Sequence, residues 1–240
     1  MCRFKSGIIL KNKVVVAPGE NDSHSDLLES LGINDDYFGA TNVFVRAELV
    51  PVNNEWWIDP AEEPDKWRFV VDQDMRPEWF DESEHEKIFR EAVCGWWKEH
   101  VLVDQKLEKL SSGYYRLKRC EVKALLNDVK VLLDSSQVGK MFDSSQVGKM
   151  FDSSQVGKMF DSSQVGEMWE SSQVGEMRDS SQVGEMRDSS QVGKMWESSQ
   201  VGEMRDRSTA RDFKNWPNVK IWVSPEGTFE MVAHQNKSEE

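Results

Sequence analysis

The stretch DSSQVGKMF, residues 134–142, decides the fold of this chain, because it recurs eight times without a gap, as far as Arg205. Ser, Ser, Gln, Val, Gly and Met are the same in all eight copies. Only three positions vary: the first is Asp or Glu, the seventh Lys or Glu, and the ninth Phe, Trp or Arg. We therefore interpret the invariant positions as structural and the variable positions as exposed.

A continuous helix fits this repeat poorly. Nine residues make about 2.5 helical turns, so each Val would lie on the opposite face from the Val before it. No apolar stripe would form, and the Gly and two Ser of each copy cost about 1–2 kcal/mol relative to good helix formers. Disorder is the other alternative, since the repeat is polar and low in complexity. The invariant Val and Met in every copy argue against disorder.

A β-solenoid accommodates the period. Short repeats at a fixed spacing are typical of stacked coils that bury their apolar residues only against their neighbours. Nine residues are too few to enclose a Val and a Met, so we expect two nonapeptides per coil, one on each side, with a turn at each Gly. The repeats then form four coils, stacked at about 4.8 Å over about 19 Å. Met and Val would form core columns, and Gln and Ser hydrogen-bonded ladders.

The period of nine resembles that of the calcium-binding nonapeptide β-roll, whose repeat is G-G-x-G-x-D-x-U-x. The likeness ends at the repeat length, because the present repeat lacks the paired glycines and the inner Asp that would bind Ca²⁺. We expect no metal and no cofactor. The single acid of each copy is typical of a residue that caps a turn.

The chain divides into four parts, and together they predict an α+β N-terminal domain followed by a short all-β solenoid. The α+β domain spans residues 1–108, the imperfect first coils 109–133, the eight nonapeptides 134–205, and a C-terminal cap and tail 206–240. Val122, among alternating polar residues, marks the early coils.

The two ends of the array differ from its middle, as is usual in solenoids. Upstream, Val129 and Val131 continue the pattern of the early coils. Downstream, Trp216 and Trp222 would cover the open end, which otherwise exposes a strand edge to self-association.

The first domain mixes alternating apolar runs with apolar residues at helical spacing. We expect strands at 6–10, 13–18, 42–52 and 65–74, and helices at 22–33 and 81–101.

The segments CRFKSGIIL, DSHSDLLESLGI, FVRAEL and FVVDQDMRPEWF lie in this first domain. With the repeats that follow, they resemble uncharacterised proteins encoded by phages and gut bacteria, in which such a domain precedes short, near-identical repeats. The resemblance covers most of the chain. It implies a viral or mobile-element origin and carries no assigned chemistry.

Cys2 would become the N-terminal residue if the initiator Met were removed, and an N-terminal Cys can act as a nucleophile with its own amine as base. A family of DNA–protein crosslinking proteins also begins Met-Cys and carries an R-A-E segment, to which Arg46, Ala47 and Glu48 are similar. The remaining motifs of that family are absent. Cys2 fits equally well as the first buried residue of a strand.

His24 and His85 lie among acids, but neither matches a metal-ligand spacing such as HExxH, so we expect exposed histidines at helix ends. Asp72 and Asp74 would point to the same side of a strand, where paired carboxylates bind metals or act in acid–base catalysis. Acids are also common where a strand runs into a turn. We expect a protein that is not an enzyme, with Cys2, His24, Asp72 and Asp74 as the residues to test for catalysis.

The ninth position of the repeat provides the binding candidates. If alternate copies share a side, its residues form two columns: Phe142, Phe160, Arg178 and Trp196 in one, and Phe151, Trp169, Arg187 and Arg205 in the other. Aromatic residues and Arg are enriched in binding hot spots. The alternative is that these side chains cover the solenoid and stack on one another, cation–π pairs included.

The net charge is −13 and is spread along the chain, which disfavours direct binding to nucleic acid or to an anionic membrane. Three cysteines at irregular spacing give no disulfide framework. We find neither a secretory signal nor a run of transmembrane length. The expected compartment is the cytoplasm of a bacterium or of a phage-infected host cell.

We therefore expect a non-enzymatic binding or assembly protein that uses the solenoid as a rigid surface. Its partner would be another protein or a second copy, as in a homodimer. One alternative is a phage-encoded inhibitor that blocks a host defence complex by acidic, nucleic-acid-like mimicry. Another is an N-terminal enzyme domain that the solenoid targets.

Overall fold

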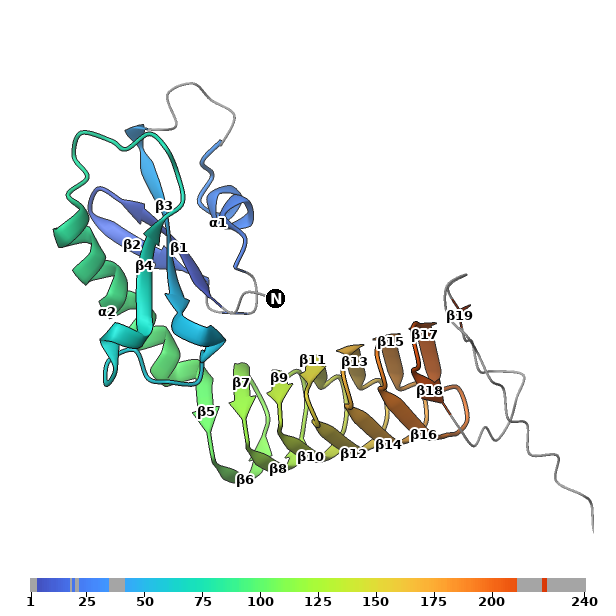
Figure 1. The fold of residues 1–240 in the computed structure, drawn as a ribbon. Helices are drawn as coiled ribbons and strands as arrows, with labels where there is room; N and C mark the ends of the chain where they lie inside the picture. Colours follow the sequence, from blue (N-terminus) through green and yellow to red (C-terminus); the bar gives the residue numbers. More distant parts are fainter. Residues whose placement is uncertain (1–3, 18, 20–21, 35–41, 211–221, 224–240) are drawn as a thin grey trace, which may run out of the picture. The chain divides into compact units, whose positions relative to one another are not determined.

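The computed structural model describes residues 4–17, 19, 22–34, 42–210 and 222–223. The chain forms two compact units, Met1–Val101 and Leu102–Glu240 (Figure 1). The first is an α+β unit and the second a parallel β-solenoid, as the sequence predicts. The solenoid begins with β5 (Val101–Val103), earlier than the boundary expected at residue 108.

The N-terminal unit is built on an antiparallel four-stranded sheet of order β2-β1-β3-β4. All four expected strands are present: β1 (Lys5–Leu10), β2 (Lys13–Val16), β3 (Phe44–Pro51) and β4 (Trp67–Val71). The last is shorter than the expected 65–74, so Asp72 and Asp74 follow the strand and do not share one side of it. Two short 3₁₀ helices, η2 (Val52–Asn54) and η3 (Pro64–Lys66), lie between β3 and β4. The central strands β1 and β3 pair in register, with Ser6 opposite Glu48.

Two α-helices cover the opposite faces of this sheet (Figure 1). The first, α1 (His24–Ser30), begins where the Ser23 side chain accepts a hydrogen bond from Asp26 N at 3.3 Å. The second, α2 (Glu82–His100), begins at Asp81, which caps Glu84 N at 2.8 Å. In the described part of the chain, neither helix has the length and apolar character needed to cross a membrane.

Alternation along β1 determines which helix each residue meets. Ile8 packs with Leu27 and Leu28 of α1 in one apolar cluster. Its neighbour Gly7 faces α2, where a Cβ atom would lie only 2.8 Å from the Phe89 ring. A glycine at this position therefore lets α2 approach the sheet closely.

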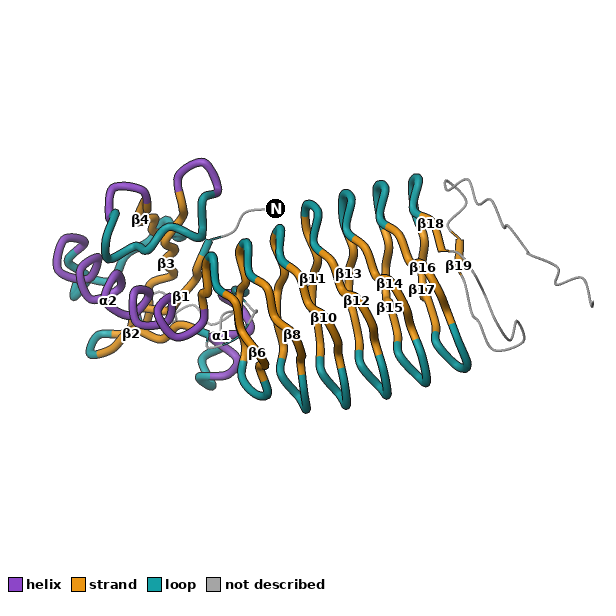
Figure 2. The backbone as a smooth tube through the Cα atoms, turned by 90° about the horizontal axis from the view of Figure 1, so that it is seen from below, coloured by secondary structure: helices purple, strands orange, loops and turns teal. Residues whose placement is uncertain are grey.

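The solenoid consists of two parallel sheets whose strands alternate along the chain (Figure 2), so each coil supplies one strand to each sheet. A coil has 18 residues within the nonapeptide array and fewer before it. The structure shows about six coils. The seven-stranded sheet contains β6 (Lys106–Leu110), β8 (Glu121–Leu125), β10 (Gln137–Met141), β12 (Gln155–Met159), β14 (Gln173–Met177), β16 (Gln191–Met195) and β18 (Thr209–Ala210). The eight-stranded sheet contains β5, β7 (Tyr114–Lys118), β9 (Lys130–Asp134), β11 (Gln146–Phe151), β13 (Gln164–Met168), β15 (Gln182–Met186), β17 (Gln200–Met204) and β19 (Trp222–Val223).

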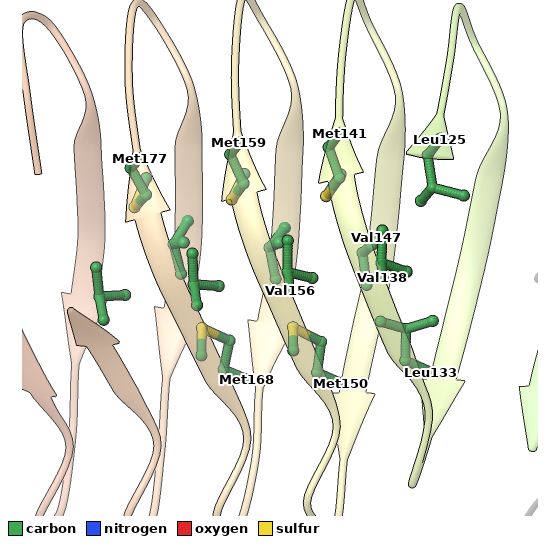
Figure 3. Close-up of a cluster of buried hydrophobic side chains, with 14 of the residues drawn as sticks. Leu125, Leu133, Val138, Met141, Val147, Met150, Val156, Met159, Met168 and Met177 are labelled. Carbon is green, nitrogen blue, oxygen red and sulfur yellow. The ribbon is translucent and has the colours of Figure 1, made fainter. Parts of the chain in front are cut away.

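The Val and the Met of every nonapeptide point into the core, where each stacks on its counterpart in the next coil (Figure 3). Met141 and Met159, for example, are fully buried and paired in register. Val and Met lie three positions apart, so a straight strand would put them on opposite faces. The strand departs from strict alternation at the Gly and the residue after it, both of which lie outside the core in β12.

The turn expected at each Gly is wrong, because the Gly lies inside the strand. A Cβ atom on Gly157 would lie 2.5 Å from the Gly139 carbonyl oxygen of the preceding coil, and the same clash recurs along both sheets. Close stacking of the backbones is therefore the reason for this invariant Gly. The first coils carry Glu108 and Lys123 at the same position, so the need for Gly at this position begins with Gly139.

The turn lies instead at the acid and the first Ser, and the prediction that the acid caps it is confirmed. Ser145 N donates to Phe142 O at 3.1 Å across the turn, and Asp143 between them has a φ of 57°. Asp tolerates this left-handed conformation better than most residues. The Asp161 carboxylate accepts a hydrogen bond from Asp143 N, one coil earlier, at 3.1 Å.

The second Ser of each nonapeptide is buried, but its hydroxyl forms the expected ladder only at the start of the array. Ser136 Oγ accepts from Cys120 N at 3.0 Å, and Ser154 Oγ accepts from Ser136 N at 3.3 Å. In most of the later copies the buried Oγ, Ser172 Oγ among them, has no hydrogen-bond partner within the described residues. The buried position therefore selects Ser for its small size rather than for a continuous hydroxyl ladder.

The early coils confirm the expected imperfect repeats before residue 134. Val122, Val129 and Val131 are buried in the solenoid core. In these coils Lys118 Nζ pairs with Asp134 Oδ1 at 2.5 Å, and both side chains are nearly inaccessible. At the other end, Trp216 and the side chain of Trp222 lie outside the described residues, so the predicted cap is not tested.

Candidate functional site

The ninth-position residues of the nonapeptides form two columns on the solenoid. The first column lies just after four successive strands of the seven-stranded sheet, β10, β12, β14 and β16, and contains Phe142, Phe160, Arg178 and Trp196. The second follows strands of the eight-stranded sheet and contains Phe151, Trp169, Arg187 and Arg205. All eight side chains are partly or fully exposed. The structure thus brings together the sets expected from the sequence.

Side chains of the first column stack along the solenoid axis. The rings of Phe142 and Phe160 are nearly parallel, at 7°, with centroids 5.1 Å apart. The Arg178 guanidinium carbon lies 6.0 Å from the Phe160 ring centroid and 5.5 Å from that of Trp196. This is the self-stacking, with cation–π pairs, that the sequence offered as the alternative to a binding role.

The second column is held by charge as well as by stacking. The Arg187 guanidinium carbon lies 4.3 Å from the Trp169 ring centroid. Arg187 Nε also pairs with Glu185 at 2.7 Å. Arg205 Nε lies 3.0 Å from Glu185 and 2.8 Å from Glu203, so it connects carboxylates of two successive coils.

Seventh-position charges support both columns. Lys149 pairs with Glu167, and Lys158 with Glu176, each at 2.9 Å and each between adjacent coils. A hydrogen bond from Lys158, and a second from Arg178, lower the pKa of Glu176. Each such pair contributes little on its own, but the regular network holds the outward side chains in one arrangement. The two columns contain no acid–base or nucleophilic group, so their chemistry is that of a binding surface.

A second candidate site lies in the N-terminal unit, where His24, Glu48 and Asp72 meet. Their ligand atoms all lie within 4.8 Å of one another. His24 is the first residue of α1, Glu48 lies in β3, and Asp72 follows β4. Because β4 pairs with β3, the end of β4 places Asp72 beside Glu48. Asp72 N donates to Arg46 O at 2.9 Å, which fixes the backbone there.

The imidazole of His24 is oriented by two contacts. Its Nε2 lies 3.2 Å from Ala47 O, and its Nδ1 lies 3.4 Å from Asp72 Oδ2. The His24 side chain is only 10% exposed, whereas that of Asp72 is 60% exposed. Burial raises the pKa of Glu48, against the lowering effect of His24, and Asp72 and Asp22 add to the rise. The group is thus rich in carboxylates and open on one side.

His24 and Asp72 were separate catalytic candidates in the sequence analysis, and the structure brings them together. Asp74 is exposed and does not belong to this group, while Cys2 lies outside the described residues. Sequence reasoning missed Glu48 as a partner of His24, because the three residues are far apart in the chain and show no local spacing motif.

The expectation that His24 and His85 are exposed is wrong. His85 is buried between Trp79 and Phe80, with ring centroids 5.5 and 5.1 Å away. Its Nδ1 lies 2.7 Å from Asp81 O, so the ring caps the start of α2 from inside the unit. Trp79 and Phe80, just before the helix, were the signal in the sequence from which burial of His85 could have been predicted.

The two described cysteines are free thiols, Cys94 and Cys120. Burial raises the pKa of both. Thiols of this kind are poor nucleophiles at neutral pH, because the reactive species is the thiolate. Neither residue is therefore a catalytic candidate.

Comparison of this chain with protein-family models, with curated proteins and with solved structures gives no match. The resemblance to phage and gut-bacterial proteins accordingly stays a prediction.

Proposed function

We propose that this chain is a non-enzymatic binding or assembly protein whose solenoid presents a rigid surface to a protein partner. The observation that carries the proposal is the pair of ordered columns of aromatic and Arg side chains, which recur in register every 18 residues. These are the residue types that dominate binding hot spots.

Pre-organisation favours a binding role for these columns. Association normally costs about 0.5–1.5 kcal/mol for each flexible side chain that becomes ordered. Here Arg178 is already held by Phe160, Trp196 and Glu176, and Arg187 by Trp169 and Glu185. Much of that cost is met within the folded solenoid, so stacking and binding are compatible roles for the same side chains.

A second copy of this chain is the partner to test first. Two copies related by a twofold axis present the same column to each other, which is the usual arrangement of homodimers. The partly exposed rings and Arg side chains of one column can pack against an identical column. Direct binding to nucleic acid remains disfavoured by the net charge of −13.

Light scattering coupled to size exclusion, at low and at high salt, tests this proposal. We expect a dimer that resists salt, and we expect the double variant Phe142→Arg, Phe160→Arg to weaken it strongly. The variant uses a residue type that the ninth position already contains. The matched control is Lys140→Glu, an exposed seventh-position change in the same sheet. A wild-type monomer at all concentrations would contradict self-association.

Exposed carboxylates at the turns favour one further candidate, acidic mimicry. Acids recur in register along the turns after both sheets, and most are exposed: Asp143, Asp161, Asp179 and Glu197 on one side, and Asp152, Glu170, Asp188 and Asp206 on the other. A protein that acts this way binds a basic partner in a salt-sensitive manner. Loss of that binding in Asp161→Asn and Asp179→Asn, with the Phe142→Arg, Phe160→Arg variant unaffected, would select mimicry over the columns.

A further inference from the structure

The N-terminal unit holds a group of ligand atoms that the solenoid-based function does not use. His24, Glu48 and Asp72 place one nitrogen and two carboxylate groups within 4.8 Å of one another. They come from a helix start, a strand and a strand end, so the fold rather than a flexible loop positions them. One imidazole with two carboxylates is a donor set that suits divalent transition metals.

The orientation of His24 is compatible with metal binding. When Nε2 carries the proton, it donates to Ala47 O and leaves the Nδ1 lone pair facing Asp72. Histidine ligands commonly fix their tautomer by this kind of hydrogen bond to a backbone carbonyl. A lone pair opposed to a carboxylate is unfavourable unless a proton or a metal cation lies between them.

Ser6 provides an independent observation beside the same group. It is the register partner of Glu48 across β1 and β3, so the two side chains lie on one face of the sheet. Ser6 is fully buried, and its Oγ has no hydrogen-bond partner among the described residues. A buried hydroxyl without a partner is costly, which is explained if a ligand or its bound water occupies the adjacent site.

Asp22 adds a third acid at the edge of the group. Its Oδ1 accepts a hydrogen bond from Ser6 N at 3.4 Å and pairs with Lys5 Nζ at 2.8 Å. Lys5 offsets the charge of Asp22, so Glu48 and Asp72 are left as the carboxylates that a cation would neutralise. The candidate ligands are therefore His24, Glu48 and Asp72, with Asp22 and Ser6 beside them.

We propose that His24 Nδ1, Glu48 and Asp72 bind a divalent transition-metal cation of the Zn²⁺ class in the N-terminal unit. The site is independent of the solenoid columns. Ligand positions that the protein leaves open would be filled by water, and Asp72, the most exposed of the three, lies on the side through which the cation enters.

Titration calorimetry with Zn²⁺ on the full-length protein at neutral pH tests this proposal. We expect one cation per chain, and we expect Glu48→Gln and Asp72→Asn to weaken binding by about tenfold or more. Both changes keep the shape of the side chain. The matched control is Asp74→Asn, an exposed acid two positions from Asp72 that lies outside the group, and it should leave the affinity unchanged. Circular dichroism checks that each variant is folded.

Imidazole NMR separates this site from binding to the many carboxylates of the solenoid. The chain contains four histidines, so the signals of His24 can be assigned with one variant. We expect Zn²⁺ to shift the His24 signals selectively, and Asp72→Asn to abolish the shift. Absence of Zn²⁺ binding, or binding that leaves the His24 signals unchanged, would overturn the proposal. So would Glu48→Gln and Asp72→Asn variants that bind as tightly as the wild type.

Discussion

At the scale of single residues, the glycine of each nonapeptide carries the packing between coils. A Cβ atom on Gly175 would lie 2.6 Å from the Gly157 carbonyl oxygen, and the Gly175 carbonyl oxygen is in turn 2.5 Å from the Cβ position on Gly193. The obstacle is backbone on both sides, so a rotamer change cannot relieve it. Within the nonapeptide array, a side chain at this position therefore requires the strands to move apart.

Gly175→Ala should therefore destabilise the solenoid by roughly 1–3 kcal/mol, the usual cost of overpacking, because the added methyl group meets the backbone of the preceding coil. Urea unfolding followed by circular dichroism measures the change in free energy of unfolding. The control is Gly95→Ala in α2, where a Cβ atom meets nothing within 4 Å and where Ala should stabilise the helix by about 0.5–1 kcal/mol. Equal effects of the two substitutions would show that the clash between coils is not decisive.

At the scale of elements, each turn is tied to the next coil by a carboxylate. Asp161 caps Asp143 N, Asp179 caps Asp161 N at 3.0 Å, and the series continues along the turns. A second series of ionised carboxylates, such as Glu176, connects the strands from outside. The contacts of Glu176 therefore depend on a carboxylate that stays charged.

The stability of the solenoid should fall as the pH drops below about 5. Hydrogen bonds from Lys158 and Arg178 lower the pKa of Glu176, so the unfolded chain binds protons at a higher pH than the folded chain does. The contribution of Glu176 to the stability is fully present above the ordinary carboxyl pKa, about 4.3 for Glu. It is lost as the pH falls through the lower pKa that Glu176 has in the folded chain. Thermal midpoints measured between pH 3 and pH 7 check this.

Glu176→Gln is the matched variant for the pH series. It should be less stable than the wild type at pH 7, with the difference shrinking toward pH 3, where the wild-type carboxylate is itself protonated. A difference that stays constant over the whole range would mean that the charge of Glu176 does not contribute.

The helices and strands could be predicted from sequence patterns, but the position of the turn in each nonapeptide could not. Periodicity predicts α1, α2 and the four strands of the first unit. Two nonapeptides per coil are predicted because nine residues are too few to enclose a Val and a Met. The position of the turn could not be found from spacing alone. Glycine is typical of turns, but here its missing side chain serves close stacking, and the acid supplies the left-handed residue instead.

At the scale of the whole molecule, the two candidate sites differ in how far the sequence reveals them. The columns are visible in the sequence because the repeat carries the same position to the same place in every second copy. The group of His24, Glu48 and Asp72 is not visible in the sequence, because these residues meet only through the pairing of β3 with β4 and the packing of α1. Tertiary contacts of that kind leave no local spacing for a motif to record.

The coil length predicts which deletions the solenoid tolerates. Removing residues 152–169, two nonapeptides, joins Phe151 to Glu170 and leaves every later strand in its own sheet. We expect this variant to fold, with a thermal midpoint lowered by only a few degrees, since stability in such arrays is close to a sum over repeats.

The control is a shorter deletion, residues 152–165, which breaks the register of Val and Met. It should lose cooperative unfolding although it removes less of the chain. Far-UV circular dichroism with thermal melts compares the two variants. If the shorter deletion were the better tolerated, register would not govern the fold.

Interchangeable coils have a consequence for how the molecule can vary in size. Each added pair of nonapeptides lengthens the solenoid by one interstrand spacing, about 4.8 Å. The length of the solenoid is therefore set by the number of nonapeptide pairs and changes in fixed increments. Tandem units this similar gain and lose copies by recombination, and such an event would alter reach while leaving the composition of the core unchanged. The length of the array is thus a heritable property on which selection can act.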